Sequence, residues 1–169
     1  MKVTLITPDS SQKFNKDVPC IFLAGPLGGT RDWRNEVKEY FKNQEGEELV
    51  IFSPENKHFK DLEIQADWET KYLNYAYKNG LIAFYCSNQT KYDSKRGYAR
   101  TTRFELGEWI VKYTFGNKDK KNLITIGIES EFEGKEYIIH RLINNYNIAD
   151  DTILDNIEDF CEIIYEKLF

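Results

Sequence analysis

The chain has 169 residues, of which 23 are Lys or Arg and 28 are Asp or Glu, so its formal net charge is −5. This length normally makes one domain, and a hydrophobic content of 41% is an ordinary globular balance. The net negative charge argues against a general nucleic-acid binder and against a polybasic membrane-surface protein, because both need a basic surface. We therefore expect a single domain over residues 1–169 that binds neither nucleic acid nor membranes.

The cysteines and the apolar runs indicate the compartment. No apolar run is long enough to cross a bilayer, and no secretion signal is visible at the N-terminus. Cys20, Cys86 and Cys161 are odd in number, far apart and set in apolar runs, which favours buried free thiols in a reducing cytosol. Two histidines and no CxxC pair nearly exclude a Cys/His zinc site, so a cytoplasmic protein without a metal is expected.

Four short apolar runs predict strands, at residues 20–24, 49–52, 81–85 and 123–128. Each run is nearly continuous, which is typical of strands buried on both faces of a parallel sheet. Apolar residues at helical spacing lie between and after them: Trp33, Val37, Tyr40 and Phe41; Trp68, Tyr72, Leu73 and Ala76; Leu106, Ile110 and Tyr113; and Ile153, Ile157, Phe160, Ile164 and Leu168. This alternation predicts an α/β domain with a parallel sheet flanked by helices.

Sheets of this class bind ligands beyond the carboxyl ends of their strands, so the segments after the strands are the candidate site. The run Gly25-Pro26-Leu27-Gly28-Gly29 follows the first strand and precedes a helix. Its glycines would let the backbone approach a ligand, and a helix N-terminus favours anions. It matches neither a dinucleotide-binding fingerprint nor a P-loop. A tight turn without a ligand explains the run equally well.

The segment that opens the third helix, Thr102-Arg103-Phe104-Glu105, has two interpretations. The first is a capping box, with Thr102 as the N-cap and Glu105 at the third helical position. The second places Glu105 at the mouth of the sheet crevice. There the helix dipole would keep its carboxylate ionised and able to attack the anomeric carbon of a sugar.

Further charged residues lie near the same predicted edge. Asp67 and Glu69 are two residues apart on the second helix and do not share a face, so one can enter a site while the other is solvated. Both would equally complement a helix N-terminus. After the third strand, a basic group that would meet a substrate phosphate, or would simply be solvated, is formed by Lys91, Lys95, Arg96, Arg100 and Arg103.

Five segments follow one another along the chain: Phe22-Leu23-Ala24-Gly25-Pro26, Asp32-Trp33-Arg34, Phe52-Ser53-Pro54, Gln65-Ala66-Asp67-Trp68-Glu69, and Thr102-Arg103-Phe104-Glu105-Leu106-Gly107-Glu108-Trp109. In this order the chain resembles the nucleoside 2-deoxyribosyltransferase-like family, from about Cys20 to Ile128. The resemblance implies a flavodoxin-like, Rossmann-like α/β fold. It also implies an enzyme that cleaves an N-glycosidic bond of a small-molecule nucleoside or nucleotide without a cofactor.

In that family a glutamate attacks C1′ of deoxyribose and expels the base, and a second base then attacks the covalent intermediate with retention. In related enzymes water takes that role and a deoxynucleoside 5′-monophosphate is hydrolysed. By position Glu105 matches the nucleophile. The resemblance also implies a homo-oligomer, because a neighbouring subunit often completes such sites. The substrate-binding residues expected here are Gly25, Pro26, Asp32, Arg34, Trp68, Thr102 and Arg103.

One departure from the family lies just before the third predicted strand. Family members usually carry an Ala-Asp pair there, and its Asp is linked to catalysis, whereas this chain has Lys78-Asn79-Gly80. The acid that protonates the base must then be absent or come from another residue, for which Asp67, Glu69 and Asp93 are the candidates. Transfer between bases, hydrolysis of a monophosphate, and binding of a nucleotide derivative without turnover all remain open.

Overall fold

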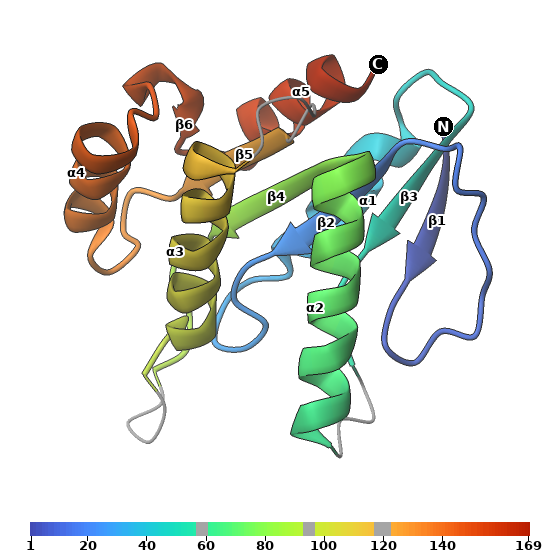
Figure 1. The fold of residues 1–169 in the computed structure, drawn as a ribbon, viewed down its shortest axis with the longest axis horizontal. Coiled ribbons are helices and arrows are strands. Elements are labelled where there is room, and N and C mark those ends of the chain that lie inside the picture. Colours follow the sequence, from blue (N-terminus) through green and yellow to red (C-terminus); the bar gives the residue numbers. More distant parts are fainter. Residues whose placement is uncertain (57–60, 93–96, 117–122) are drawn as a thin grey trace.

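The computed structural model describes residues 1–56, 61–92, 97–116 and 123–169 (Figure 1). In these ranges six parallel strands form one sheet: β1 (Lys2–Ile6), β2 (Cys20–Ala24), β3 (Glu48–Phe52), β4 (Leu81–Cys86), β5 (Leu123–Ile128) and β6 (Ile153–Leu154). The helices are α1 (Trp33–Lys42), α2 (Leu62–Asn79), α3 (Arg100–Phe115), α4 (Lys135–Tyr146) and α5 (Ile157–Leu168), with a 3-10 turn η1 (Asp150–Thr152). The predicted α/β fold with a parallel sheet is confirmed.

The strand order is β1-β3-β2-β4-β5-β6. Without the edge strand β1, this is the order of a flavodoxin-like sheet, in which the direction of winding reverses between β2 and β4. Ligands of such sheets bind outside the carboxyl ends of the strands at this switch point. The loops after β2 and β4 therefore frame the place where a site is expected.

Helices cover both faces of the sheet, which explains the continuous apolar runs in the sequence. Along β2, Phe22 faces α2 and α3, whereas Ile21 and Leu23 face α1 and α5. Figure 1 shows α2 and α3 running over the same face, and Tyr77 of α2 packs on Trp109 of α3 with ring centroids 5.3 Å apart. Burial of apolar side chains on both faces is the main stabilising contribution to a sheet of this kind.

The four predicted strands are present within one residue of their expected bounds, and two strands and one α-helix were not predicted. Strand β1 is an edge strand with an exposed first residue, and β6 has only two residues, so neither has a continuous buried run. Helix α4 was also missed. Ile153 was expected in the tail helix but lies in β6. Helix α5 begins only at Ile157, because Asn156 caps it by accepting a hydrogen bond from the amide of Asp159.

The three cysteines are buried free thiols, as predicted. Burial raises the pKa of Cys20, Cys86 and Cys161 to about 12 in each case, so their thiols stay protonated and unreactive at neutral pH. In the described part of the chain, no helix combines the length and the apolar character needed to span a membrane.

Candidate functional site

Two carboxyl groups meet between α2 and α3. Glu69 comes from the third turn of α2 and Glu105 from the second turn of α3, and their side chains hydrogen-bond to each other. Both residues are half-buried. Burial, followed by the charge of Glu69 and this hydrogen bond, raises the pKa of Glu105 from 4.5 to about 8. Near neutral pH the pair therefore holds one proton and one negative charge.

The start of α3 differs from the predicted capping box. The helix begins at Arg100, preceded by Ala99 in a left-handed backbone conformation (φ 53°), and no side chain caps it. Thr102 is instead buried inside the first turn. The expectation that the helix dipole keeps Glu105 ionised is also wrong. The dipole acts mainly within the first turn, and burial beside another carboxylate outweighs it.

Gln65 holds the carboxyl group of Glu69 in place. Its Nε2 donates to Glu69 Oε1 (2.6 Å) and to the carbonyl oxygen of Pro54 (3.0 Å), and its Oε1 accepts from Asn56 Nδ2 (3.2 Å). Gln65 is only 6% exposed, so these partners satisfy its amide. The sequence analysis did not single out Gln65, although a glutamine four residues before a helical glutamate is a recognisable hydrogen-bonding spacing.

A buried arginine holds the turn that follows β2. Arg34 is 3% exposed, and its guanidinium donates to the carbonyl oxygens of Pro26 (2.7 Å), Gly25 (2.7 Å) and Leu23 (3.3 Å). A planar guanidinium can reach several acceptors at once, which suits this arrangement. The predicted ligand-binding residue Arg34 therefore has backbone partners that fix the glycine-rich turn.

Arg34 is also the buried positive charge of the site. Burial lowers its pKa to about 10, and the negative charges of Glu55, Glu105 and Glu69 act in the opposite direction. The guanidinium thus stays protonated at neutral pH. It compensates part of the charge of the carboxyl pair, and it lowers the pKa of Glu105 against the larger effect of burial.

Gly25 is required by packing. A Cβ atom at this position would collide with the carbonyl oxygen of Tyr85 and with the indole ring of Trp33. That indole is itself fixed, because its Nε1 donates to the carbonyl oxygen of Pro26 (3.2 Å). The close approach of β2 to β4 at the switch point therefore accounts for Gly25, whether or not a ligand lies above it.

A hollow of about 200 Å³ opens beside this turn. Asp32, in its wall, caps α1 by accepting from the amide of Asn35 (3.2 Å), and Glu55 accepts from Ser53 Oγ (2.8 Å). Three of the predicted binding residues share the hollow, which is lined by Pro26, Leu27, Thr30, Arg31, Asp32, Trp33, Arg34 and Glu55. Arg34 links the hollow to the carboxyl pair, since it lines the first and acts electrostatically on the second.

Glu129 connects three loops at the carboxyl edge of the sheet. It follows β5 and is 7% exposed. Its Oε1 accepts from the hydroxyl of Tyr85 (2.7 Å) and from Arg31 of the glycine-rich turn, and its Oε2 accepts from the amide of Asn88 after β4 (2.6 Å). The sequence analysis did not identify Glu129. One buried carboxylate thereby joins the loops that follow β2, β4 and β5.

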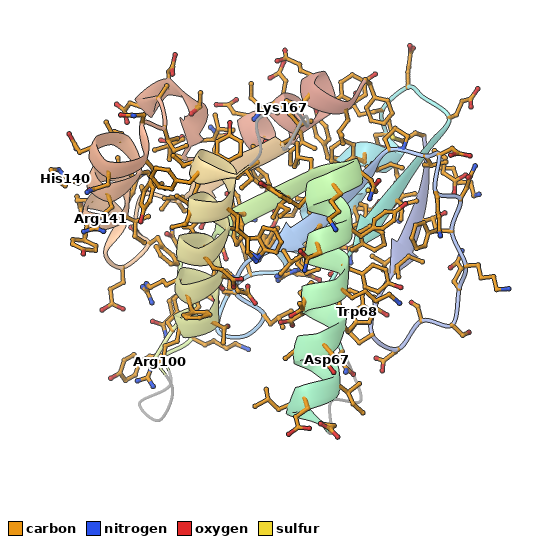
Figure 2. All side chains as sticks on the ribbon, viewed as in Figure 1. Asp67, Trp68, Arg100, His140, Arg141 and Lys167 are labelled. Carbon is orange, nitrogen blue, oxygen red and sulfur yellow. The ribbon has the colours of Figure 1, made fainter. Side chains whose placement is uncertain are left out.

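Two other predicted residues on α2 differ in their surroundings. Asp67, which is labelled on α2 in Figure 2, is exposed, whereas Glu69 interacts with Glu105. Trp68 is half-buried and packs on Tyr72 and Phe22, with ring centroids 4.7 and 6.0 Å apart. Trp68 therefore forms part of the core under α2.

The predicted basic group is only partly described. Arg103 donates to the carbonyl oxygens of Tyr98 and Glu133 (2.8 Å to the second), so its guanidinium has backbone partners. Lys91 and Arg100 are exposed. The candidate phosphate-binding residues Lys95 and Arg96, and the candidate acid Asp93, lie outside the described residues.

Gly80, which replaces the family's Asp, lies at the opposite edge of the sheet from the carboxyl pair. It ends α2 and precedes β4, at the amino ends of the parallel strands. A Cβ atom there would collide with the carbonyl oxygen and the thiol of Cys20. Packing against β2 therefore explains the glycine.

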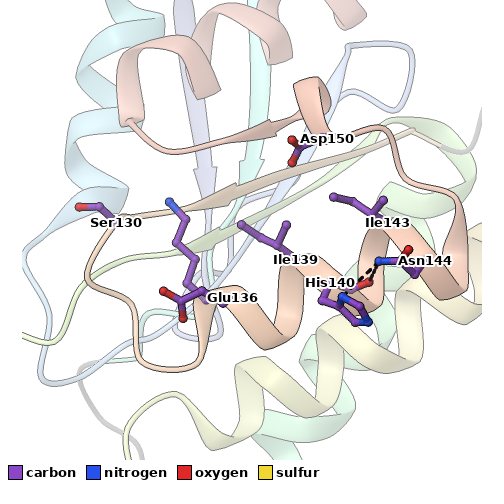
Figure 3. A pocket seen from close by; sticks show the side chains of 8 residues that line it. Ser130, Glu136, Ile139, His140, Ile143, Asn144 and Asp150 are labelled. Atoms are coloured by element: carbon purple, nitrogen blue, oxygen red, sulfur yellow. Dashed lines mark hydrogen bonds between the residues drawn. The ribbon is translucent and has the colours of Figure 1, made fainter.

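A second, larger hollow of about 550 Å³ lies beside α4 and contains none of the predicted site residues. Figure 3 shows its wall, where Asn144 donates to the carbonyl oxygen of His140 (2.9 Å). Its lining mixes both charges with two isoleucines: Ser130, Lys135, Glu136, Ile139, His140, Ile143, Asn144 and Asp150. Among all described residues, no group of three or more His, Cys, Asp or Glu side chains is placed to hold a metal ion.

No protein-family model matches the chain, and no curated protein matches its sequence. Function is therefore inferred from the residues and from their arrangement at the switch point of a flavodoxin-like sheet.

Proposed function

We propose that this protein is an enzyme of the nucleoside 2-deoxyribosyltransferase-like type, which cleaves the N-glycosidic bond of a nucleoside and transfers the sugar. The observation that carries the proposal is the carboxyl pair Glu69–Glu105, in which burial and the neighbouring Glu69 raise the pKa of Glu105 to about 8. Glu105 is the nucleophile and Glu69 is the acid. No cofactor takes part, and a cytoplasmic homo-oligomer belongs to the same proposal.

The charge state of the pair matches the needs of this reaction. The proton of Glu105 passes to Glu69, and the ionised Glu105 attacks C1′ of the sugar. Glu69 then gives the proton to the departing base, which leaves with the electron pair of the broken C1′–N bond. The products are a glycosyl ester on Glu105, an ionised Glu69 and a neutral base, so atoms and charge balance. Attack on the ester by a second base, or by water, releases the sugar and restores the pair.

Glu69 is favoured over Asp67 as the acid because Glu69 hydrogen-bonds to Glu105, whereas Asp67 is exposed. A proton donor must lie within hydrogen-bond reach of the groups between which the proton moves. Asp93 is a further predicted candidate that lies outside the described residues.

The hollow beside the glycine-rich turn favours an unphosphorylated nucleoside as the substrate. Asp32 and Glu55 in its wall are acceptors for sugar hydroxyl groups and repel a phosphate. Both cations in its lining have other partners, because Arg34 donates to three carbonyl oxygens and Arg31 pairs with Glu36 and Glu129. A volume of about 200 Å³ is below the roughly 300–1,000 Å³ of sites for drug-sized ligands, and it suits a single sugar ring.

The proposal is tested by incubating the protein with each common deoxynucleoside and a second free base, and by separating the products chromatographically. We expect both the exchanged nucleoside and the released base, and we expect Glu105→Ala and Glu69→Gln to lower the rate by about 10²-fold or more. Glu63→Gln is the matched control, because Glu63 is an exposed glutamate in the first turn of α2.

Two other results would redirect the interpretation. Release of base without exchange, and with a preference for monophosphates, would indicate the hydrolase. A rise in melting temperature with a nucleotide but no product from any substrate would indicate a binding protein, because a ligand of the folded state alone raises apparent stability. Either result would refute the transfer reaction on nucleosides.

A further inference from the structure

The orientation of the Gln65 amide is determined by its neighbours. The carbonyl oxygen of Pro54 can only accept, so the Gln65 group 3.0 Å from it must be the NH₂ group. The Gln65 oxygen then faces Asn56 Nδ2, which donates to it. The second N–H of Gln65 consequently points at Glu69 Oε1, 2.6 Å away. Gln65 can therefore only donate to Glu69.

We infer that Gln65 is a positioning residue that holds Glu69 as the ionised member of the carboxyl pair and so places the shared proton on Glu105 in the resting protein. A hydrogen-bond donor stabilises the ionised form of the carboxylate that it contacts. Gln65 contacts Glu69 and not Glu105, so its effect on the two groups is unequal. The catalytic meaning of this arrangement rests on the proposed function.

The other charged groups near the pair act in different ways. Arg34 from α1 interacts with both Glu69 and Glu105, so it stabilises the charge wherever it resides. Glu108, on α3, disfavours the ionised form of Glu105, which adds to the effect of Gln65. Glu55, in the loop after β3, acts on Arg34 and is paired with Lys38 at 3.3 Å.

This placement has a defined role in the proposed reaction. In the resting protein Glu105 is protonated and cannot act as a nucleophile. The leaving base later requires this same proton. The same donor favours transfer of the proton from Glu69 to that base, because the carboxylate that remains accepts the hydrogen bond from Gln65. The same hydrogen bond therefore keeps the site unreactive when it is empty and assists departure of the base when a nucleoside is bound.

The inference is tested without substrate, by ¹³C NMR titration of the protein with labelled glutamate carboxyl carbons, assigned with Glu69→Gln and Glu105→Gln. We expect the wild-type signal of a protonated carboxyl near neutral pH to belong to Glu105, and that of Glu69 to be ionised. Gln65→Met, which removes the donor, should shift the proton toward Glu69 by about tenfold in relative population. Gln65→Asn, which withdraws the donor by one methylene, should shift it in the same direction.

Thr70→Met is the matched control, because Thr70 is exposed on the same helix next to Glu69. Its titration should follow the wild type. A proton found on Glu69 in the wild type, or an unchanged distribution in a folded Gln65 variant, would overturn the inference. An active enzyme with either result would leave the proposed function standing. A protein with the expected proton distribution but no product would refute the proposed function alone.

Discussion

Compared with the wild type, Glu105→Gln should be stabilised more at alkaline pH than at acidic pH. It replaces a half-buried acid whose ionised form is disfavoured. Burial and the charge of Glu69 raise the pKa of Glu105 from 4.5 to about 8 in the folded state. As pH rises between these values, the unfolded chain releases the proton while the folded protein keeps it. Folded-state stability is therefore lost progressively over that interval and reaches a constant lower level above about pH 8.

The size of the effect follows from the pKa change. Each pKa unit corresponds to about 1.4 kcal/mol, so the change from 4.5 to about 8 amounts to at most about 5 kcal/mol. Glu105 is half-buried, and solvent screens part of this cost. We expect the free energy of unfolding of the wild type to fall by roughly 2–4 kcal/mol relative to Glu105→Gln between about pH 5 and about pH 9.

Urea titrations of both proteins at the two pH values measure this quantity, and the contributions of titrating groups that do not interact with Glu105 cancel in the difference. Glu63→Gln serves as the control, because the carboxylate of Glu63 is exposed in the first turn of α2 and should change the difference by less than about 0.5 kcal/mol. A wild-type-minus-variant difference that is independent of pH would refute the reasoning. If the wild type instead gained stability relative to the variant as pH rises, the attraction between Arg34 and the ionised Glu105 would be larger than the effect of burial.

Further expectations concern the reaction and the turn that holds it. The initial rate of base release should fall as pH rises through about 8, because the pair then loses the proton that the base needs, and a rate that is constant across this range would contradict that role. Asp67→Asn should leave the same rate within about twofold, since Asp67 is exposed, and a larger loss would make it the acid. In urea titrations, Arg34→Lys should cost about 2–4 kcal/mol because an ammonium cannot replace the guanidinium on three carbonyl oxygens; a loss below about 1 kcal/mol would show that these bonds are dispensable. Gly25→Ala should destabilise by roughly 1–3 kcal/mol through collision with the Tyr85 carbonyl oxygen, and a neutral effect would mean that the turn relaxes easily.

The central fold could be predicted from the sequence because four strands are covered on both faces. Their side chains are apolar whichever face they meet, so the runs are continuous and easily recognised. Strand β1 pairs on one side only and begins with an exposed lysine, and β6 consists of two residues, so neither produces such a run. The strand order also depends on contacts between segments that are far apart in the sequence. The resemblance implied this order, but the local pattern could not reveal it.

The carboxyl pair was only half predictable. Glu69 lies four residues before Leu73 and seven before Ala76, both buried, so helical periodicity places it on the inward face of α2. Asp67 does not share that spacing, and this difference was available in the sequence. The pairing of Glu69 with Glu105 depends on how α2 and α3 pack, and no local pattern encodes it.

The capping box failed for a physical reason. Thr102 and Glu105 have the right spacing, but the chain enters α3 through a left-handed Ala99, which moves the first helical residue to Arg100. A pattern of side chains does not reveal such a backbone turn, and alanine is an unusual residue at this conformation. The misplaced boundary made a half-buried acid look like a capping residue.

The Glu129 bridge has a consequence for how a ligand would be received. Because a single carboxylate ties the ends of β4 and β5 to the glycine-rich turn, these segments are already ordered before anything binds. Binding of a ligand then costs little conformational entropy in these segments. Their affinity for a sugar therefore reflects the contacts that they make with it. A substitution of Glu129, which follows β5 and is far from the carboxyl pair in sequence, would therefore loosen Arg31, a residue that lines the hollow.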